Sequence, residues 1–149
     1  MTGRRYERKL VNSLDEHGWA AMKSPSSGSG TDRDQPDLLV GNAAVSLPPL
    51  AIEAKSTGQD AYTIDYCEAE QLQRFSDRFG ARPVIAMYWK RPNSGGKDYG
   101  GWWFKSLHEV RQSPVENDSG EHHLRPRRGD RHKWASISDL DNGRLRPEE

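Results

Sequence analysis

The chain has 149 residues, a length typical of one domain with its own hydrophobic core. Its 22 Lys and Arg residues balance 22 Asp and Glu residues, so net charge alone gives no indication of DNA binding, which local basic patches decide. The single cysteine, Cys67, excludes an internal disulfide. The sequence has no apolar run of membrane-spanning length and no signal peptide, so we expect a soluble, intracellular, cytoplasmic protein.

The first expected element is an amphipathic helix from Gly3 to Gly18, since glycine commonly ends helices. Its apolar stripe consists of Tyr6, Leu10, Val11 and Leu14. Glu7 falls inside the arc of this stripe when about 100° is counted per residue. A glutamate in that position either extends to water or delivers a carboxylate to a functional site, and its place within the arc favours the second interpretation.

A short strand over Trp19–Met22 leads into residues 23–35, where Pro25 is the only apolar residue. This composition predicts a mobile loop. The hydroxyls and glycines of the loop, together with Lys23, suit contacts to phosphate oxygens. From the residues alone, a plain linker is an equally good interpretation.

Two apolar runs, Pro36–Val40 and Leu50–Lys55, carry three charged residues. Read as strands, they alternate their side chains between two faces, so Glu53 and Lys55 share one face. Burying these two side chains together with Asp37 is costly unless they pair or bind a cation. Carboxylate oxygens are ligands that Mg²⁺ prefers. The alternative is a solvent-facing salt bridge on two half-buried strands.

The middle of the chain predicts one more helix and two strands. Asp65 and Glu68 resemble a capping box at the start of a helix that ends at Gly80. Pro83–Trp89 is apolar on both faces and predicts a buried strand. A turn-rich connection and a strand over Gly101–Phe104 follow.

A short helix is expected from Ser106, followed by a polar stretch at 112–131. The basic residues near its end are Arg125, Arg127, Arg128 and Arg131. We interpret this stretch as a surface loop or hairpin in preference to a DNA-binding patch. Lys133–Ile137 predicts a last strand, and Ser138 a helix cap. The order of helices and strands predicts a single α/β domain over residues 1–149, with helices on both faces of its sheet.

Together these residues resemble those of the archaeal-type Holliday junction resolvases, a branch of the PD-(D/E)xK nucleases. The signature is Pro36-Asp37, a spacer, and then Glu53-Ala54-Lys55. The resemblance covers most of the chain up to about residue 110 at similar spacing. The further motifs are Glu7-Arg8, Gly18-Trp19-Ala20, Lys23-Ser24-Pro25, Leu38-Leu39-Val40-Gly41-Asn42, Phe75-Ser76-Asp77-Arg78-Phe79-Gly80, Pro83-Val84-Ile85-Ala86 and Trp103-Phe104.

The resemblance implies a central mixed β-sheet flanked by helices, the restriction-endonuclease-like fold. It implies that Asp37 and Glu53 bind a metal ion, with the backbone carbonyl of Ala54 and the helix carboxylate of Glu7 as further ligands. Lys55 would orient or activate the attacking water, or stabilise developing charge. The expected ion is Mg²⁺, with Mn²⁺ as a substitute.

The resemblance also implies a DNA-binding surface. Its implied residues are Arg4, Arg5, Arg8, Lys23, Ser24, Ser27 and Ser29. Ser27 corresponds to a loop serine that is important for catalysis in some members, and Ser26 or Ser29 could take its place. Lys23 stands where the family often has arginine, which removes a bidentate phosphate contact.

The implied function is a structure-specific endonuclease that resolves four-way DNA junctions by paired symmetric nicks, through Mg²⁺-dependent phosphodiester hydrolysis. Its implied partners are branched DNA and a second copy of the chain, paired through Phe75 and Phe79, with no membrane. Two alternatives stay open: another PD-(D/E)xK DNA endonuclease of the restriction or repair type, and a DNA-binding relative that does not cleave. The intact set of Asp37, Glu53 and Lys55 argues against the second alternative.

Overall fold

The computed structural model describes residues 3–24, 35–90, 101–112, 115–116 and 122–145. Most of the loop expected at 23–35 lies outside the described residues, and so do Ser26, Ser27 and Ser29. The described elements, in chain order, are α1 (Gly3–Glu16), β1 (Ala20–Lys23), β2 (Leu38–Gly41), β3 (Leu50–Thr57), α2 (Tyr66–Phe79), β4 (Arg82–Trp89), β5 (Trp102–Ser106), α3 (Leu107–Arg111), β6 (Val115–Glu116), β7 (His122–His123), the 3₁₀ helix η1 (Arg128–Lys133) and α4 (Ile137–Asp141). All helices and strands expected before residue 112 are present.

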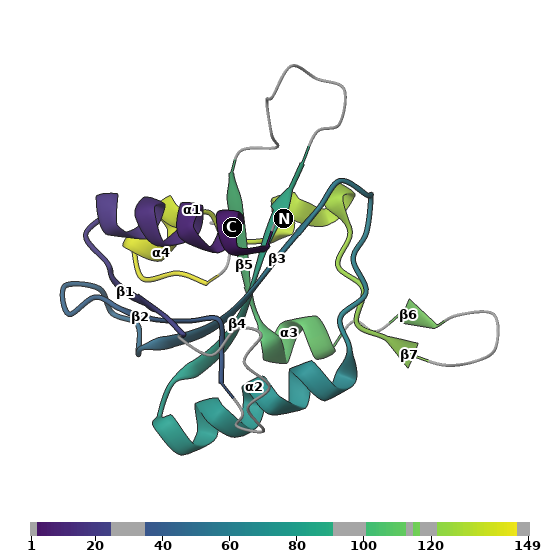
Figure 1. Ribbon diagram of the computed structural model, residues 1–149, viewed down its shortest axis with the longest axis horizontal. Coiled ribbons are helices and arrows are strands. Elements are labelled where there is room, and N and C mark those ends of the chain that lie inside the picture. Colours follow the sequence, from purple (N-terminus) through teal and green to yellow (C-terminus); the bar gives the residue numbers. More distant parts are fainter. Residues whose placement is uncertain (1–2, 25–34, 91–100, 113–114, 117–121, 146–149) are drawn as a thin grey trace.

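Five strands form one mixed sheet in the order β1-β2-β3-β4-β5. The pairs β1–β2, β2–β3 and β4–β5 are antiparallel, whereas β3 and β4 run parallel. A parallel pair requires a crossover connection, which contains α2. Figure 1 shows α1 and α4 over one face of the sheet, and α2 and α3 over the other. The predicted α/β sheet with helices on both faces is confirmed.

Two hydrophobic clusters lie on the two faces of this sheet. The first, which includes Leu14 of α1, is called the α1-side cluster, and the second, which includes Leu72 of α2, is called the α2-side cluster. The residues of β3 divide between them, since Ile52 belongs to the first cluster and Ala51 to the second. This alternation confirms the strand expected at 50–55, and it directs Lys55 to the α2 side of the sheet.

Glycines with positive φ follow α1 and α2. Gly18 has a φ of 88° and Gly80 a φ of 87°, a conformation that residues with a Cβ rarely adopt. At the start of α2, the side chain of Asp65 accepts a hydrogen bond from a backbone N–H of the first turn at 2.7 Å. The second half of the expected capping box is wrong, because the carboxylate of Glu68 lies 2.7 Å from Nζ of Lys55 instead.

The strand expected over Lys133–Ile137 is wrong. Its first residue ends the 3₁₀ helix η1, and Ala135 makes only an isolated bridge to Phe104. Trp134 packs in the α2-side cluster and Ala135 in the α1-side cluster. Neighbouring residues that are buried on opposite sides give a strand-like alternation in the sequence without forming a strand.

The cap of α4 lies two residues before the expected one. Ser136, not Ser138, is the N-cap, because its hydroxyl accepts from the backbone N–H of Asp139 while the Asp139 carboxylate accepts from the backbone N–H of Ser136. The indole N–H of Trp19 then donates to Asp141 at 2.8 Å. This bond ties the end of α4 to the segment that follows α1.

The polar stretch at 112–131 contains a hairpin and a docked segment. β6 and β7 pair antiparallel, in agreement with the expected hairpin. From Leu124 the chain follows the connection at 60–64, with bridges between Ile64 and Leu124 and between Ala61 and Arg127. Leu124 is 1% exposed. The polar composition of this stretch does not predict that it packs against residues 60–64, because a single buried leucine gives no hydrophobic periodicity.

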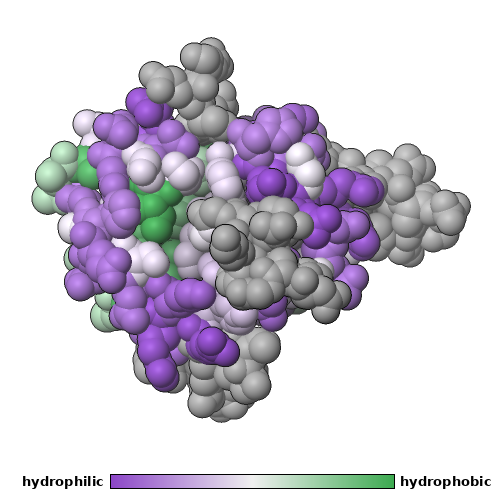
Figure 2. All heavy atoms as spheres, turned by 90° about the horizontal axis from the view of Figure 1, so that it is seen from above, coloured by the Kyte–Doolittle hydropathy of each residue, from purple (hydrophilic) through white to green (hydrophobic). Residues whose placement is uncertain are grey.

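The outer surface is strongly polar, as expected from a chain with 30% charged residues. Figure 2 shows a largely hydrophilic face, with apolar residues visible mainly in one patch to the left of centre. Across the described ranges, no helix has both the length and the apolar character needed to cross a membrane.

Candidate active site

The candidate active site lies where β2 and β3 separate. β2 begins at Leu38, which pairs with Ile52, whereas β3 continues to Thr57 alongside β4. Asp37 precedes β2 and therefore faces the part of β3 that β2 does not cover. Its Oδ2 atom accepts a hydrogen bond from the backbone N–H of Ala54 at 2.9 Å. This bond fixes the first expected metal ligand against the strand that carries the second.

Asp37 and Glu53 form a carboxylate pair with little access to water. The side chain of Glu53 is 15% exposed. Burial, together with the charge and hydrogen bond of Asp37, raises the pKa of Glu53 to about 9, and the charge of Lys55 offsets only part of this shift. Without a cation, the Glu53 carboxyl therefore keeps its proton at neutral pH.

The chemistry of this pair fits a hard divalent cation. A buried carboxyl such as Glu53, whose pKa is raised by burial and by the charge of Asp37, gains stability in its ionised form from a nearby positive charge. Mg²⁺ prefers oxygen ligands and commonly binds through one or two carboxylates. Asp37 and Glu53 would hold the ion. The N–H and C=O of a strand residue point to the same edge, so the carbonyl of Ala54 also faces the gap between β2 and β3.

Glu7 reaches the same place from α1. Its side chain is 9% exposed, in agreement with its expected position inside the apolar arc. The residues that line the active-site pocket, of about 320 Å³, are Tyr6, Glu7, Asp37, Ala54, Lys55, Ser56, Tyr62 and Trp102. In the described part of the chain, no three His, Cys, Asp or Glu residues are grouped so that they could hold one ion. The role of Glu7 as a direct metal ligand therefore stays a prediction.

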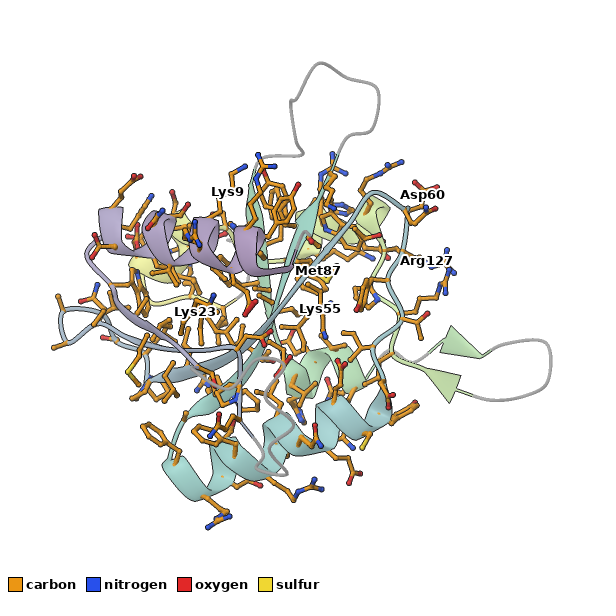
Figure 3. All side chains as sticks on the ribbon, viewed as in Figure 1. Lys9, Lys23, Lys55, Asp60, Met87 and Arg127 are labelled. Carbon is orange, nitrogen blue, oxygen red and sulfur yellow. The ribbon has the colours of Figure 1, made fainter. Side chains whose placement is uncertain are left out.

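Lys55 is held in the pocket by two carboxylates. Its Nζ atom lies 2.7 Å from Oε2 of Glu68 and 3.9 Å from Oε2 of Glu53. Burial lowers the pKa of Lys55, but the hydrogen bond to Glu68 and the charges of both glutamates raise it, and the net pKa lies above the ordinary value. Figure 3 shows Lys55 on the side of β3 that faces α2. Its ammonium group is therefore a permanent positive charge at neutral pH.

Glu68 and Tyr62 are residues of this site that the sequence patterns do not reveal. Glu68 follows Asp65 by three positions, and this spacing favours a capping role. Tyr62 stands in a polar stretch without periodicity, and its ring centre lies 5.8 Å from Nζ of Lys55. Both are brought to Lys55 by the path of the chain between β3 and α2, which no local pattern specifies.

Three arginines expected to contact DNA lie on α1. Arg5 and Arg8 are exposed, and only the backbone of Arg4 is described. They stand in the same turns of the helix as Glu7, so exposed cations accompany the carboxylate that reaches the pocket. Their contact with DNA stays a prediction.

Two further residues expected to bind DNA lie beside Asp37. Lys23 ends β1 and pairs with the first residue of β2. The backbone N–H of Ser24 donates to the carbonyl of Asp37 at 2.8 Å, and its hydroxyl donates to Oε1 of Gln35 at 2.8 Å. Residues 24 and 35 are thus held together next to the active site. The catalytic role of Ser27, outside the described residues, stays a prediction.

The fold and this arrangement of residues define a class of protein. A mixed sheet covered by helices, with Asp37, Glu53 and Lys55 gathered where two strands separate, is a nuclease fold of the PD-(D/E)xK type. The model of the family described as "Archaeal holliday junction resolvase (hjc)" matches residues 1–113. The chain belongs to this family.

Individual proteins are similar to the chain in sequence. A crossover junction endodeoxyribonuclease of Sulfolobus islandicus rod-shaped virus 1 is 31% identical over 93 residues, which are 60% of this chain and 74% of that protein. The crossover junction endodeoxyribonuclease Hjc of Archaeoglobus fulgidus is 34% identical over 85 residues, 57% of this chain and 60% of that protein. The Sulfurisphaera tokodaii protein of the same name is 27% identical over 85 residues, 57% and 58% of the two chains.

A solved structure shows the same fold. The Holliday junction resolvase Hjc of Archaeoglobus fulgidus has a TM-score of 0.71 to this chain at 23% sequence identity. The alignment covers 94% of this chain and 100% of that one. The similarity therefore extends beyond the residues that the family model matches.

Proposed function

We propose that this chain is a structure-specific endodeoxyribonuclease that resolves four-way DNA junctions by paired symmetric nicks, through Mg²⁺-dependent hydrolysis of phosphodiester bonds. The observation that carries the proposal is the Asp37–Glu53 pair at the gap between β2 and β3, with Nζ of Lys55 3.9 Å from Glu53. Family membership and the names of the relatives, crossover junction endodeoxyribonucleases, support the choice of substrate.

The residues of the candidate active site have separate roles in hydrolysis. A divalent cation, when bound, supplies Lewis acidity that makes water more acidic and offsets charge at phosphorus. Asp37 and Glu53 would hold that cation, and the N–H of Ala54, which donates to Asp37 at 2.9 Å, keeps this carboxylate in its orientation. A ligand that is fixed by its own hydrogen bond needs little reorganisation when DNA arrives.

Lys55 acts as a fixed positive charge and not as a general base. A general base must release its proton near the working pH, whereas the pKa of Lys55 lies above its ordinary value. Its ammonium group stabilises the negative charge that develops on the phosphate oxygens. Glu68, 2.7 Å away, positions the side chain before substrate binds.

Two DNA substrates of the same arm sequence test this function, a synthetic four-way junction and a linear duplex. Incubated with the protein and Mg²⁺, the junction is expected to be nicked at matching positions in two opposing strands, and the linear duplex to be barely cut. Omitting Mg²⁺ is expected to stop the reaction because two carboxylates alone cannot activate water. Equal cutting of both substrates would instead support a general PD-(D/E)xK endonuclease.

The two-fold symmetric homodimer that paired nicks require would form through the outer surface of α2. The rings of Phe75 and Phe79 stack there with centres 5.5 Å apart, and Phe79 is 55% exposed. Met22 of β1 is 62% exposed and pairs with Leu39, which packs against the α2-side cluster. Paired residues of an antiparallel ladder share a face, so Met22 and Phe79 add exposed apolar area to the same side of the molecule.

Phe79→Ala is expected to convert the dimer to a monomer, because it removes two exposed rings from one two-fold interface. At about 2 kcal/mol for each ring, association weakens by roughly 10³-fold. Sedimentation velocity measures the change, and a cruciform plasmid should then yield mainly singly nicked circles. Tyr66→Ala is the control, since Tyr66 is 41% exposed at the other end of α2. A wild-type monomer at working concentration would contradict the dimer.

A further inference from the structure

The segment at 124–134 lies beside the active site. It follows the part of the chain that the family model matches. Leu124 is 1% exposed and Trp134 is 3% exposed, both within the α2-side cluster. Between these anchors, the backbone N–H of Tyr62 donates to the carbonyl of Pro126 at 3.1 Å, and that of Ile64 donates to the carbonyl of Leu124 at 2.7 Å. Two buried ends and this short ladder fix the position of the segment.

This segment encloses, together with β5 and α3, a pocket of about 180 Å³ with a basic lining. Its charged residues are the cations Lys105, Arg125, Arg127 and Lys133, together with the carboxylate Asp130; we call it the basic pocket. Arg125 donates to the hydroxyl of Thr63 at 2.7 Å. Nζ of Lys133 lies 3.8 Å from Asp130. Within the described part of the chain, the other three cations have no carboxylate partner, so the pocket keeps an excess of positive charge.

The size and charge of the basic pocket indicate its ligand. Small-molecule and cofactor sites have volumes of about 300–1,000 Å³. The volume of the basic pocket is smaller than this range. A single phosphate group is smaller, and guanidinium groups match its oxygens with two parallel hydrogen bonds. The pocket therefore suits one phosphate of a polyanion better than a free nucleotide or a cofactor.

The basic pocket and the active-site pocket lie on opposite sides of one short connection. Tyr62 lines the active-site pocket, and Pro126 lines the basic pocket. The carbonyl of Pro126 accepts a hydrogen bond from the backbone N–H of Tyr62. Figure 3 shows Arg127 pointing outward beyond this connection, away from Lys55. A DNA strand whose scissile phosphate lies at Lys55 can therefore continue along this side of the molecule.

We propose that the basic pocket binds a backbone phosphate of the DNA arm that enters the active site. The inference rests on the proposed function, because it takes DNA as the substrate. Arg125, Arg127 and Lys133 all follow residue 113, so this contact belongs to a segment beyond the residues that the family model matches. Phosphate contacts position DNA without reading its sequence, and the pocket strengthens binding to every junction alike.

Arg127→Ala tests the proposal with little risk to the fold, because the side chain is exposed and the bridge to Ala61 uses only the backbone. Arg82→Ala is the matched control. It removes the same charge from another exposed arginine, at the end of the β3–β4 pair opposite to Thr57. Thermal melting checks that both variants are folded. Fluorescence anisotropy with a labelled four-way junction, without Mg²⁺, measures binding at several KCl concentrations.

Arg127→Ala is expected to weaken junction binding about tenfold near 0.1 M salt and to reduce the slope of log K against log salt concentration by about 1. Single-turnover cleavage at sub-saturating protein should slow by a similar factor, because less of the junction is bound. Lys133→Ala, at a side chain 63% exposed, should act in the same direction.

Three outcomes separate this inference from the proposed function. Arg127→Ala with the affinity and salt slope of Arg82→Ala would overturn the basic pocket as a DNA site. Wild-type protein that binds the junction without cutting it would overturn the nuclease proposal, while an effect of Arg127→Ala on binding would still support the pocket. Wild-type protein that does not bind four-way DNA would overturn both.

Discussion

Asp37→Asn and Glu53→Gln are each expected to abolish Mg²⁺-dependent cleavage of a four-way junction while leaving junction binding largely intact. Each change replaces a carboxylate that we propose as a metal ligand with a neutral amide of the same shape, so the cation would be held weakly or not at all. Because metal assistance is worth several kcal/mol in hydrolysis, the rate should fall by about 10³-fold or more. Binding depends mainly on phosphate contacts by cations elsewhere.

Single-turnover rates with saturating protein measure this effect, and anisotropy measures binding in parallel. Asp77→Asn provides the matched control, because this aspartate is exposed on α2 and hydrogen-bonds Gln73 at 2.9 Å. Its cleavage rate should equal that of the wild type. Either Asp37→Asn or Glu53→Gln cutting at the wild-type rate would refute the assigned metal site.

The metal-free protein is expected to lose stability as the pH rises from about 4.5 to about 9, because the pKa of Glu53 is raised from 4.5 to about 9 by folding. In this window the unfolded chain has released the proton and the folded protein still binds it. The free energy of unfolding therefore falls with pH, by up to about 1.4 kcal/mol per pH unit. The contribution is complete below pH 4.5 and is lost as the pH passes through 9.

Glu53→Gln should flatten this dependence, because glutamine has the shape of the protonated acid and no charge to desolvate. Thermal denaturation in EDTA at several pH values measures the effect, and the variant should be more stable than the wild type above neutral pH. Glu70→Gln is the control, since the Glu70 side chain is 58% exposed. Added Mg²⁺ should stabilise the wild type and Glu70→Gln, but not Glu53→Gln. Parallel pH profiles for wild type and Glu53→Gln would refute a buried, protonated Glu53.

The order of elements up to residue 112 can be predicted because each has a local cause. α2 is marked by Asp65 before it and Gly80 after it, and β4 by an unbroken apolar run. The structure of the C-terminal part has no such local cause in the sequence. Trp134 and Ala135 imitate a strand because they enter two different clusters, and this is decided by tertiary packing.

The same distinction applies to the candidate site. Asp37, Glu53 and Lys55 are evident because charged residues in apolar strands need a reason to be there. Glu68 is not evident, because its partner lies on another element and its spacing from Asp65 already has a local explanation. The basic pocket is hidden for a similar reason. Its cations come from a stretch that reads as a surface loop, and only the backbone pairing with residues 60–64 reveals its fixed position.

The ladder between β2 and β3 has a consequence for how relatives of this chain can be recognised. Asp37 and Ala54 are 17 positions apart along the chain, yet they share a hydrogen bond, because Leu38 meets Ile52 in the register of the two strands. Register, and not the length of the joining turn, sets the distance between the two carboxylates. The connection at 42–49 could therefore be longer or shorter without displacing either carboxylate. A sequence motif with a fixed number of residues between the aspartate and the glutamate would therefore miss relatives in which this connection has another length. A pattern that leaves the gap open and requires an apolar strand on each side would retain them.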